Sequence, residues 1–469
     1  MQDDLSRLSA VELRELVRTR KASPVEILDA HLKAIARFNP ALNAIVTLVE
    51  DQARAVAKAA ETTDGGNLPL HGLPIVIKDV TLTKGIRTTF GSPLYKDFVP
   101  DEDAAAVERL RKAGAIILGK TNTPEFATGA NTVNELFGAT RNPWNPALSP
   151  AGSSGGSAVA VATGMVPLAQ GTDFGCSIRI PASFCGIVGV RTTGGLVPNR
   201  GMRLPWDGGQ VHGPLARSAE DAALMLDGMI GLDPLWPISA APPWASALDI
   251  VQRTDNAKGL RIAYAPDIAG FGVDREIDDI CRAAVRRLEA DGAIVDVIDF
   301  SAADGFDAYK VLRGEWMVGQ QLERMAMLDQ FGPNLQGNVR DGLKLTVRDT
   351  ATAENLRETV WKRFCELFGQ YDFLITPAAP VPPYPVDKNY PDEVGGHKLD
   401  NYIDWIAPAF LVTLVGFPAG SVPGGKTTTN LPVGLQIVGP RFSEPQILGL
   451  AKLVQRSNPI GWPTIVNES

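Results

Sequence analysis

Two stretches near the start of the chain carry hydrophobic residues at helical spacing. The first follows Ser9 and the second follows Ser23, and in each a glutamate three residues on completes a capping box, which satisfies free amide groups of the first helical turn. The apolar positions are Leu13, Leu16 and Val17 in the first stretch and Ile27, Leu28, Leu32 and Ile35 in the second. This spacing predicts two amphipathic helices that pack one face against a larger body.

Further along, short apolar runs typical of buried strands alternate with helical patterns. Residues 72–80, GLPIVIKDV, form such a run, and it carries one lysine, Lys78, near its end. Residues 103–119 combine a helical pattern with a β-type run, and residues 276–299 repeat that order. Alternation of this kind predicts an α/β fold in which helices cover a sheet.

Residues 405–425, WIAPAFLVTLVGFPAGSVPGG, carry no charge over a length that could span a membrane. Three prolines and four glycines interrupt the segment, and such residues disrupt a long helix. We therefore expect a buried strand-and-turn segment here rather than a transmembrane helix.

The composition disfavours several classes of protein. The formal net charge is -8 and no basic cluster occurs, whereas binding to a nucleic-acid backbone relies on a basic surface. The first sixteen residues contain acidic side chains where an export signal has positive ones, which predicts a cytoplasmic protein. The four cysteines, Cys176, Cys185, Cys281 and Cys365, show no C-x-x-C spacing, so neither a disulfide framework nor a metal site is expected.

Residues 151–177 are dense in serine and glycine, and they place two possible nucleophiles, Cys176 and Ser177, side by side. A phosphate loop of the GxxxxGK[ST] type is disfavoured because its lysine is absent. Residues 152–156 match G-x-S-x-G, but a proline-broken loop precedes them and only two histidines follow in the chain. Ser-His catalysis is therefore disfavoured as well, since it needs a strand before the serine and a histidine after it.

A lysine is another possible base for a serine nucleophile. Lys78 could serve if its pKa fell from about 10.4 to about 7–8, a cost of about 4 kcal/mol that burial can supply. The alternative is a structural lysine whose stem lies along the apolar surface while its amine pairs with Asp79. Spacing alone leaves both interpretations open.

Residues 152–189, GSSGGSAVAVATGMVPLAQGTDFGCSIRIPASFCGIVG, resemble the amidase signature, the hallmark of a family of amide hydrolases. The resemblance extends back through GLPIVIKDV and forward through LPVGLQIVGPRFSEPQIL, and so covers essentially the whole chain. It implies a large twisted mixed β-sheet core flanked by α-helices on both sides. It also implies one domain over residues 1–469, with N-terminal helices packing on the core (1–60), a signature core (61–215), and the remaining sheet with elements that cover the substrate site (216–469).

The resemblance assigns a Ser-cisSer-Lys triad to this chain. Carried over by position, the nucleophile falls on Ser177, the bridging serine in a cis peptide on Ser153, and the base on Lys78. Lys78 would take a proton through Ser153 while Ser177 attacks the carbonyl carbon to form an acyl-enzyme. The backbone amides of the family's oxyanion hole fall on Phe174, Gly175, Cys176 and Ser177.

Other positions near the triad follow from the same resemblance. Cys176 stands where the family commonly has a glycine, and we interpret it as a small side chain that faces away from the substrate. Asp173 and Arg179 are interpreted as an ion pair that holds the turn, and Ser154 as a supporting serine. The segment that borders the acyl pocket falls on Ala127, Thr128, Gly129 and Ala130, whose small uncharged side chains leave room for an apolar group.

The implied activity is hydrolysis of a C–N amide bond, with no metal and no cofactor, in a small to medium substrate with an apolar or aryl part. Carbamate or ester hydrolysis could accompany it, because one oxyanion hole serves any acyl carbonyl. The expected partner is a small-molecule amide, with no nucleic acid and no membrane, and a homodimer stays open. Trp316, Met317, Met325 and Met327 lie in a variable region and are interpreted either as core or as a cover over the site.

Two alternatives accompany this interpretation. The first is the glutaminase (A) subunit of a glutamyl-tRNA amidotransferase, whose substrate-binding acid would fall near residue 406. The sequence there is apolar, and Asp404 is two residues away. The second is a non-catalytic binding protein on the same fold, since fold does not imply function.

Overall fold

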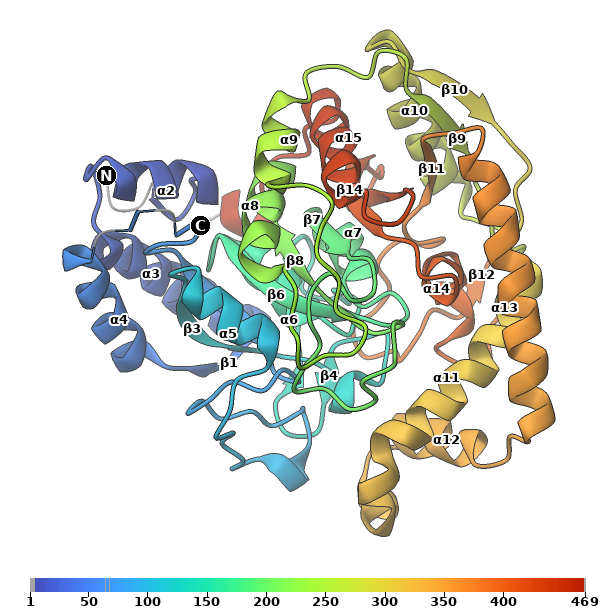
Figure 1. Ribbon diagram of the computed structural model, residues 1–469, viewed down its shortest axis with the longest axis horizontal. Helices are drawn as coiled ribbons and strands as arrows, with labels where there is room; N and C mark the ends of the chain where they lie inside the picture. The colour runs from blue at the N-terminus through green and yellow to red at the C-terminus, as the bar shows by residue number, and fades with distance from the viewer. Residues whose placement is uncertain (1–4, 64, 67, 468–469) are drawn as a thin grey trace.

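The computed structural model describes residues 5–63, 65, 66 and 68–467. A large mixed sheet of eleven strands forms its centre (Figure 1). In spatial order the strands are β1 (Ile45–Leu48), β3 (Ile116–Thr121), β2 (Pro74–Lys78), β6 (Leu168–Asp173), β8 (Val211–Ala216), β7 (Val188–Arg191), β14 (Ala419–Lys426), β15 (Pro432–Val438), β11 (Phe373–Pro377), β9 (Arg261–Tyr264) and β10 (Ile294–Val297). Strands β3, β2 and β6 are parallel, as are β11, β9 and β10, and the other neighbours are antiparallel.

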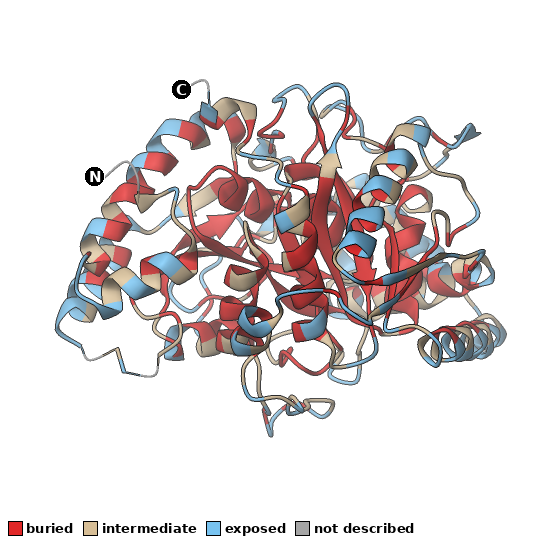
Figure 2. Ribbon diagram, turned by 90° about the horizontal axis from the view of Figure 1, so that it is seen from above, coloured by how far each residue is buried: buried red, intermediate tan, exposed pale blue. Residues whose placement is uncertain are grey.

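Helices cover the sheet, which confirms the predicted α/β class (Figures 1 and 2). They are α2 (Ala10–Arg18), α3 (Pro24–Leu42), α4 (Glu50–Thr62), α5 (Ala105–Lys112), α6 (Gly155–Ala162), α7 (Arg179–Cys185), α8 (Ala219–Met229), α9 (Ala247–Arg253), α10 (Arg275–Ala290), α11 (Phe306–Gln321), α12 (Pro333–Gly342), α13 (Val347–Phe368), α14 (Ala407–Leu414), α15 (Glu444–Ser457) and α16 (Thr464–Asn467). In Figure 2 the strands are mostly buried, whereas many helices expose their outer faces.

Strand β2 shows how the sheet separates two hydrophobic layers. Its residues alternate between faces, as strand geometry requires. Ile75 and Ile77 belong to the layer that contains α5, α8 and α15, whereas Val76 packs in the layer that contains α4 and α6. Alternation therefore directs Lys78, the last residue of β2, to the same face as Val76, toward the Gly/Ser-rich segment that leads into α6.

The predicted N-terminal helices are confirmed, and both capping boxes form as expected, with Ser9 and Glu12 at α2 and Ser23 and Glu26 at α3. The expectation for residues 405–425 is wrong in its first half. Residues 407–414 form the buried helix α14, and strand β14 begins only at residue 419. A short run that is apolar all round does not distinguish a buried helix from a buried strand.

No helix in the described ranges is both long and apolar enough to cross a membrane. Helix α11 packs against both α12 and α13 beside the sheet, at one end of the molecule in Figure 1. One domain over residues 1–469 stays a prediction, and the recruitment of strands from both halves of the chain into the same sheet favours it.

Candidate active site

Lys78 ends β2 inside the protein, with no exposed surface. Its Nζ lies 2.6 Å from Ser153 Oγ and 2.9 Å from Thr172 Oγ1. Its backbone N–H donates to Gln170 Oε1 at 3.1 Å. Neighbouring strands β2 and β6 thus fix both ends of the lysine. Among the described residues, its amine has two hydroxyl groups and no carboxylate at hydrogen-bonding distance.

Burial lowers the pKa of Lys78 from 10.5 to about 7, although the charge of Asp173 opposes this effect. The shift follows from the cost of holding an ammonium ion away from water. An amine with this pKa is substantially neutral at pH 7 and above, and a neutral amine has a lone pair that can accept a proton.

The alternative pairing of Lys78 with Asp79 is wrong. The Asp79 carboxylate accepts from the backbone N–H and the hydroxyl of Thr89, and the cation nearest to it is Lys120, whose Nζ lies 3.7 Å from Asp79 Oδ1. Lys120 also donates to Thr81 O. Two fully buried lysines therefore lie at or next to the ends of adjacent strands, and it is Lys120 that is paired.

Ser153 lies just before α6, and the peptide bond between Gly152 and Ser153 is cis. The next residue, Ser154, donates its backbone N–H to Ser177 O at 3.0 Å. Glycine at position 156 is required by packing, because a Cβ there would lie 2.5 Å from the backbone nitrogen of Asn122. The start of α6 is thus pressed against the chain after β3 and tied to the turn that carries Ser177.

The turn after β6 has all of its carbonyl groups held. The oxygens of residues 173–177 accept, in order, from Arg191 Nη1, Tyr309 Oη, Arg179 Nη2 and the backbone N–H groups of Ile180 and Ser154, over 2.8–3.3 Å. In a planar trans peptide the N–H points opposite to the preceding C=O. The N–H groups of residues 174–177 therefore point away from these donors, and within the described ranges those of Gly175, Cys176 and Ser177 have no acceptor.

Asp173 and Arg179 form a buried ion pair across this turn. Arg179 Nη2 lies 2.8 Å from Asp173 Oδ1, and both side chains are fully buried. Asp173 also accepts from the backbone N–H of Ile178. Burial opposes the charge of Asp173, but Arg179 and then Arg191 outweigh it and lower the pKa of the carboxyl group. The pair holds the turn in one shape.

Cys176 is 2% exposed, and its Sγ lies 3.5 Å from Gly152 O. Burial raises the pKa of the thiol above its usual range. A thiolate is therefore strongly disfavoured at this position, and a thiolate is what a cysteine nucleophile requires. Ser177, by contrast, is only half-buried.

A narrow cavity of about 40 Å³ brings Ser153 and Ser177 together with the turn. Its lining consists of Phe126, Ala127, Gly129, Ser153, Thr172, Phe174, Gly175, Cys176, Ser177, Gln210, Tyr309, Arg313, Trp316, Met317, Tyr402 and Ile406. Of the segment expected to border the acyl pocket, Ala127 and Gly129 line the cavity, whereas Thr128 and Ala130 are buried outside it.

Tyr309, Arg313 and Tyr402 are among the lining residues that were not expected from the sequence. A signal exists for the first two, because positions 309, 313, 316 and 317 fall on one face of α11. Trp316 and Met317, for which the sequence left core and cover open, do line the cavity, while Met325 and Met327 pack around Phe331.

An outer cavity of about 350 Å³ adjoins the narrow one and shares Phe174, Tyr309, Arg313 and Trp316 with it. The rings of Phe174 and Trp316 stack at 4.2 Å between centroids. Trp316 Nε1 donates to Asp207 Oδ2 at 2.8 Å, which fixes the indole in this position. Because small-molecule sites usually measure about 300–1,000 Å³, a substrate needs part of the outer space as well.

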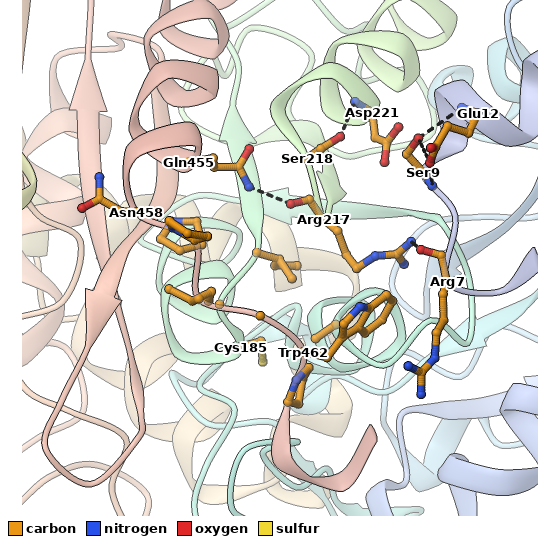
Figure 3. A pocket seen from close by; sticks show the side chains of 18 residues that line it. Arg7, Ser9, Glu12, Cys185, Arg217, Ser218, Asp221, Gln455, Asn458 and Trp462 are labelled. Atoms are coloured by element: carbon orange, nitrogen blue, oxygen red, sulfur yellow. Dashed lines mark hydrogen bonds between the residues drawn. The ribbon is translucent and has the colours of Figure 1, made fainter. Parts of the chain in front are cut away.

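A separate cavity of about 340 Å³ lies where the N-terminal segment, α8 and the C-terminal segment meet (Figure 3). Arg217 stacks over the ring of Trp462 there, at 4.5 Å, and donates to the carbonyl oxygens of Arg7 and Leu8. Its described lining does not include Lys78, Ser153 or Ser177. Its polar groups bind chain segments to one another, so we interpret it as a structural junction.

Known proteins resemble this chain in both sequence and fold. The family model described as Amidase matches residues 26–448. An acylamidase from Rhodococcus erythropolis is 34% identical and covers 93% of this chain and 92% of its own length. A glutamyl-tRNA(Gln) amidotransferase subunit from Methylococcus capsulatus is also 34% identical and covers 97% of both chains. The crystal structure of a bacterial aryl acylamidase of the amidase signature family superposes with a TM-score of 0.89, at 27% identity over 98% of each chain.

Proposed function

The chain belongs to the amidase family and is an amide-hydrolysing enzyme, and from that premise we propose that Ser177, Ser153 and Lys78 carry out the reaction. The observation that carries this proposal is the short contact between the buried amine of Lys78 and Ser153 Oγ, together with the pKa of about 7 for that amine. A base with this pKa suits catalysis near neutral pH.

The proposed reaction has two halves. Ser177 Oγ attacks the carbonyl carbon of the amide, its proton passes to Ser153 Oγ, and the Ser153 proton passes to Lys78 Nζ. The tetrahedral intermediate then collapses, the C–N bond breaks, and the proton returns through Ser153 to the leaving nitrogen. Water attacks the resulting acyl-enzyme by the same proton route, which releases the acid and restores Ser177.

The outward amides of the Ser177 turn support the proposed oxyanion hole. The N–H groups of Gly175, Cys176 and Ser177 lack acceptors among the described residues, and the preceding carbonyls are fixed by the bonds described above. Donors fixed in advance stabilise the oxyanion of the intermediate, and each is worth about 3–4 kcal/mol of barrier. Phe174 directly precedes these three residues in the turn, and its N–H is proposed as a further donor.

The walls of the two cavities favour an acyl or amine group with apolar or aryl character. Phe126, Phe174 and Trp316 contribute aromatic side chains to these walls, and aromatic rings pack well against such side chains. One relative is named an acylamidase and one solved structure is named an aryl acylamidase. We accordingly propose a free-standing amidase that acts on small to medium amides with an apolar or aromatic part.

The amidotransferase relatives keep the glutaminase function as the second candidate. A glutaminase site must hold the ammonium group of glutamine, which calls for an acidic side chain. In the described part of the chain the catalytic cavity has none: Ile406 lines it, and the nearby Asp404 pairs with Lys310 instead. The amidase proposal is therefore favoured.

A substrate panel tests the proposed function. Purified enzyme should release product from anilides or aryl carbamates and not release ammonia from glutamine, because the described lining of the catalytic cavity includes aromatic side chains and no carboxylate. Primary amides and esters complete the panel, and amine, acid or ammonia release is measured for each. Ammonia from glutamine alone would contradict the proposal in favour of the glutaminase.

A Cys176→Ala variant should keep most of its activity. The thiol is buried and its pKa is raised. We therefore expect the side chain only to fill space, and the backbone N–H to serve as an oxyanion donor. The expected loss in kcat/KM is less than about tenfold, or about 1.4 kcal/mol. Steady-state kinetics on the best panel substrate checks this. Complete loss with a folded protein would make the thiol the nucleophile.

A further inference from the structure

Arg313 of α11 is a buried cation that faces both cavities. It is 7% exposed, and it lines the catalytic cavity and the outer cavity. Its Nη1 donates to Asn338 Oδ1 at 2.5 Å and its Nη2 to Tyr402 Oη at 2.7 Å. Both acceptors are neutral, and these bonds use two of the five N–H donors of a guanidinium.

No carboxylate neutralises this charge within the described ranges, since none lies within 4.0 Å of Arg313. The acids that line the outer cavity are otherwise engaged: Asp207 accepts from Trp316 and from backbone N–H groups, Glu354 pairs with Arg357, and Glu315 is exposed. An unpaired buried charge is costly. The pocket is thus built for an anion that arrives with the ligand.

The catalytic cavity also restricts which anion fits. Of the residues described as lining it, Arg313 alone is charged. A zwitterion such as glutamine would find a partner for its carboxylate and none for its ammonium group. A ligand with one carboxylate and an apolar remainder satisfies both the guanidinium and the aromatic walls.

We propose that the substrate is an amide that carries a carboxylate, and that Arg313 binds this carboxylate through its planar fork of N–H donors. The proposal rests on the proposed amidase function and specifies its substrate class. Bidentate pairing suits an arginine better than a lysine, because the guanidinium matches the geometry of two carboxylate oxygens.

Matched substrates test the proposal. N-phenylsuccinamic acid and pentananilide both release aniline and differ by a carboxylate on the acyl side. Likewise, 4-acetamidophenylacetic acid and 4-methylacetanilide differ by a carboxylate on the amine side. Wild-type enzyme should prefer the acid in at least one pair by roughly tenfold or more in kcat/KM.

Three variants separate charge recognition from support of the fold. Arg313→Met should abolish most of the preference for the acid, and Arg313→Lys should keep part of it. Tyr402→Phe removes a hydrogen-bond acceptor of Arg313 but leaves the charge, so it should preserve the preference. A wild type without preference in either pair, or an Arg313→Met enzyme that loses activity equally on both members, would overturn the proposal.

Binding gives a readout that does not depend on turnover. Calorimetry on the Ser177→Ala protein should show at least roughly tenfold tighter binding of N-phenylsuccinamic acid or 4-acetamidophenylacetic acid than of its neutral partner. Adding Arg313→Met should remove the difference. If the wild type hydrolyses no anilide but this difference is present, the proposed activity fails while the anion site stands; equal binding of acid and neutral ligands overturns the anion site.

Discussion

A Ser177→Ala variant should lose about 10³–10⁶-fold in kcat on any substrate that the wild-type enzyme hydrolyses, because no acyl-enzyme can form without the hydroxyl. Ser177 is half-buried, and its side chain makes no hydrogen bond among the described residues. The free energy of unfolding should therefore change by less than about 0.5 kcal/mol. Kinetics and thermal unfolding of the same preparation give both quantities.

The neighbouring Cys176→Ala variant is the matched control, since it changes the adjacent side chain and leaves Ser177 in place. A slowly deacylated aryl carbamate provides a second readout. Mass spectrometry of a digest should place the added carbamoyl group on Ser177 in the wild type and nowhere in the Ser177→Ala protein. Retained turnover in Ser177→Ala, or modification of Cys176, would contradict the assignment.

Local sequence signals predicted some of the elements that carry the proposed triad. The apolar run 72–80 predicted a strand that carries a lysine at its end, and Lys78 does end β2. The resemblance to the amidase signature assigned the roles of Ser153 and Ser177. In the folded protein Lys78 Nζ lies 2.6 Å from Ser153 Oγ. The two residues are 75 positions apart in the chain, so the contact itself depends on tertiary packing, which includes the close approach of Gly156 to the chain after β3.

Features set by long-range packing were not predictable from the sequence. The sequence left open a pairing of Lys78 with Asp79, but Lys120 is the lysine that lies beside Asp79. Parallel strands β2 and β3 bring both lysines near the same edge of the sheet. Arg313 sits on a helix face whose spacing resembles that of ordinary core residues. In the folded protein its partners are Asn338 of α12 and Tyr402 of the segment before α14, and no acid in the described part of the chain pairs with it.

The buried helix α14 illustrates the same limit. Residues 407–414 are apolar on every side, so no periodicity distinguishes helix from strand. A proline inside an apolar run suggests that a helix is interrupted there, but Pro408 lies in the first turn of α14, where proline is compatible with a helix start. In the folded protein the Ala409 and Thr413 oxygens of this helix accept from Arg179, which links α14 to the turn that carries Ser177.

Replacing Lys78 should be nearly as damaging as replacing Ser177. Without a base, activity should fall by about 10²–10⁴-fold in kcat/KM. Lys78→Met is the best test, because it keeps most of the side-chain volume in a fully buried position, whereas Lys78→Ala adds a cavity. Kinetics on an uncharged substrate, with thermal unfolding as a check on the fold, measures the loss.

The pH profile separates loss of the base from general damage. The folded-state pKa of Lys78 is about 7, and the base must be neutral, so wild-type kcat/KM should rise with pH through about 7 and then level off. His212, whose pKa burial lowers to about 4, titrates well below this range. Lys120, at about 8, is the group that could be confused with Lys78.

A Lys120→Met variant should therefore keep an activity midpoint near pH 7, while Lys78→Met should have no rise there. The pH dependence of the free energy of unfolding gives an independent test. Because the folded pKa of Lys78 lies below the unfolded value of 10.5, the unfolded state binds more protons between about pH 7 and 10.5, and Lys78 makes the free energy of unfolding rise with pH across that window. Lys78→Met should lack this contribution. A normal acidic limb in Lys78→Met would assign the base to another residue, even if its activity were low.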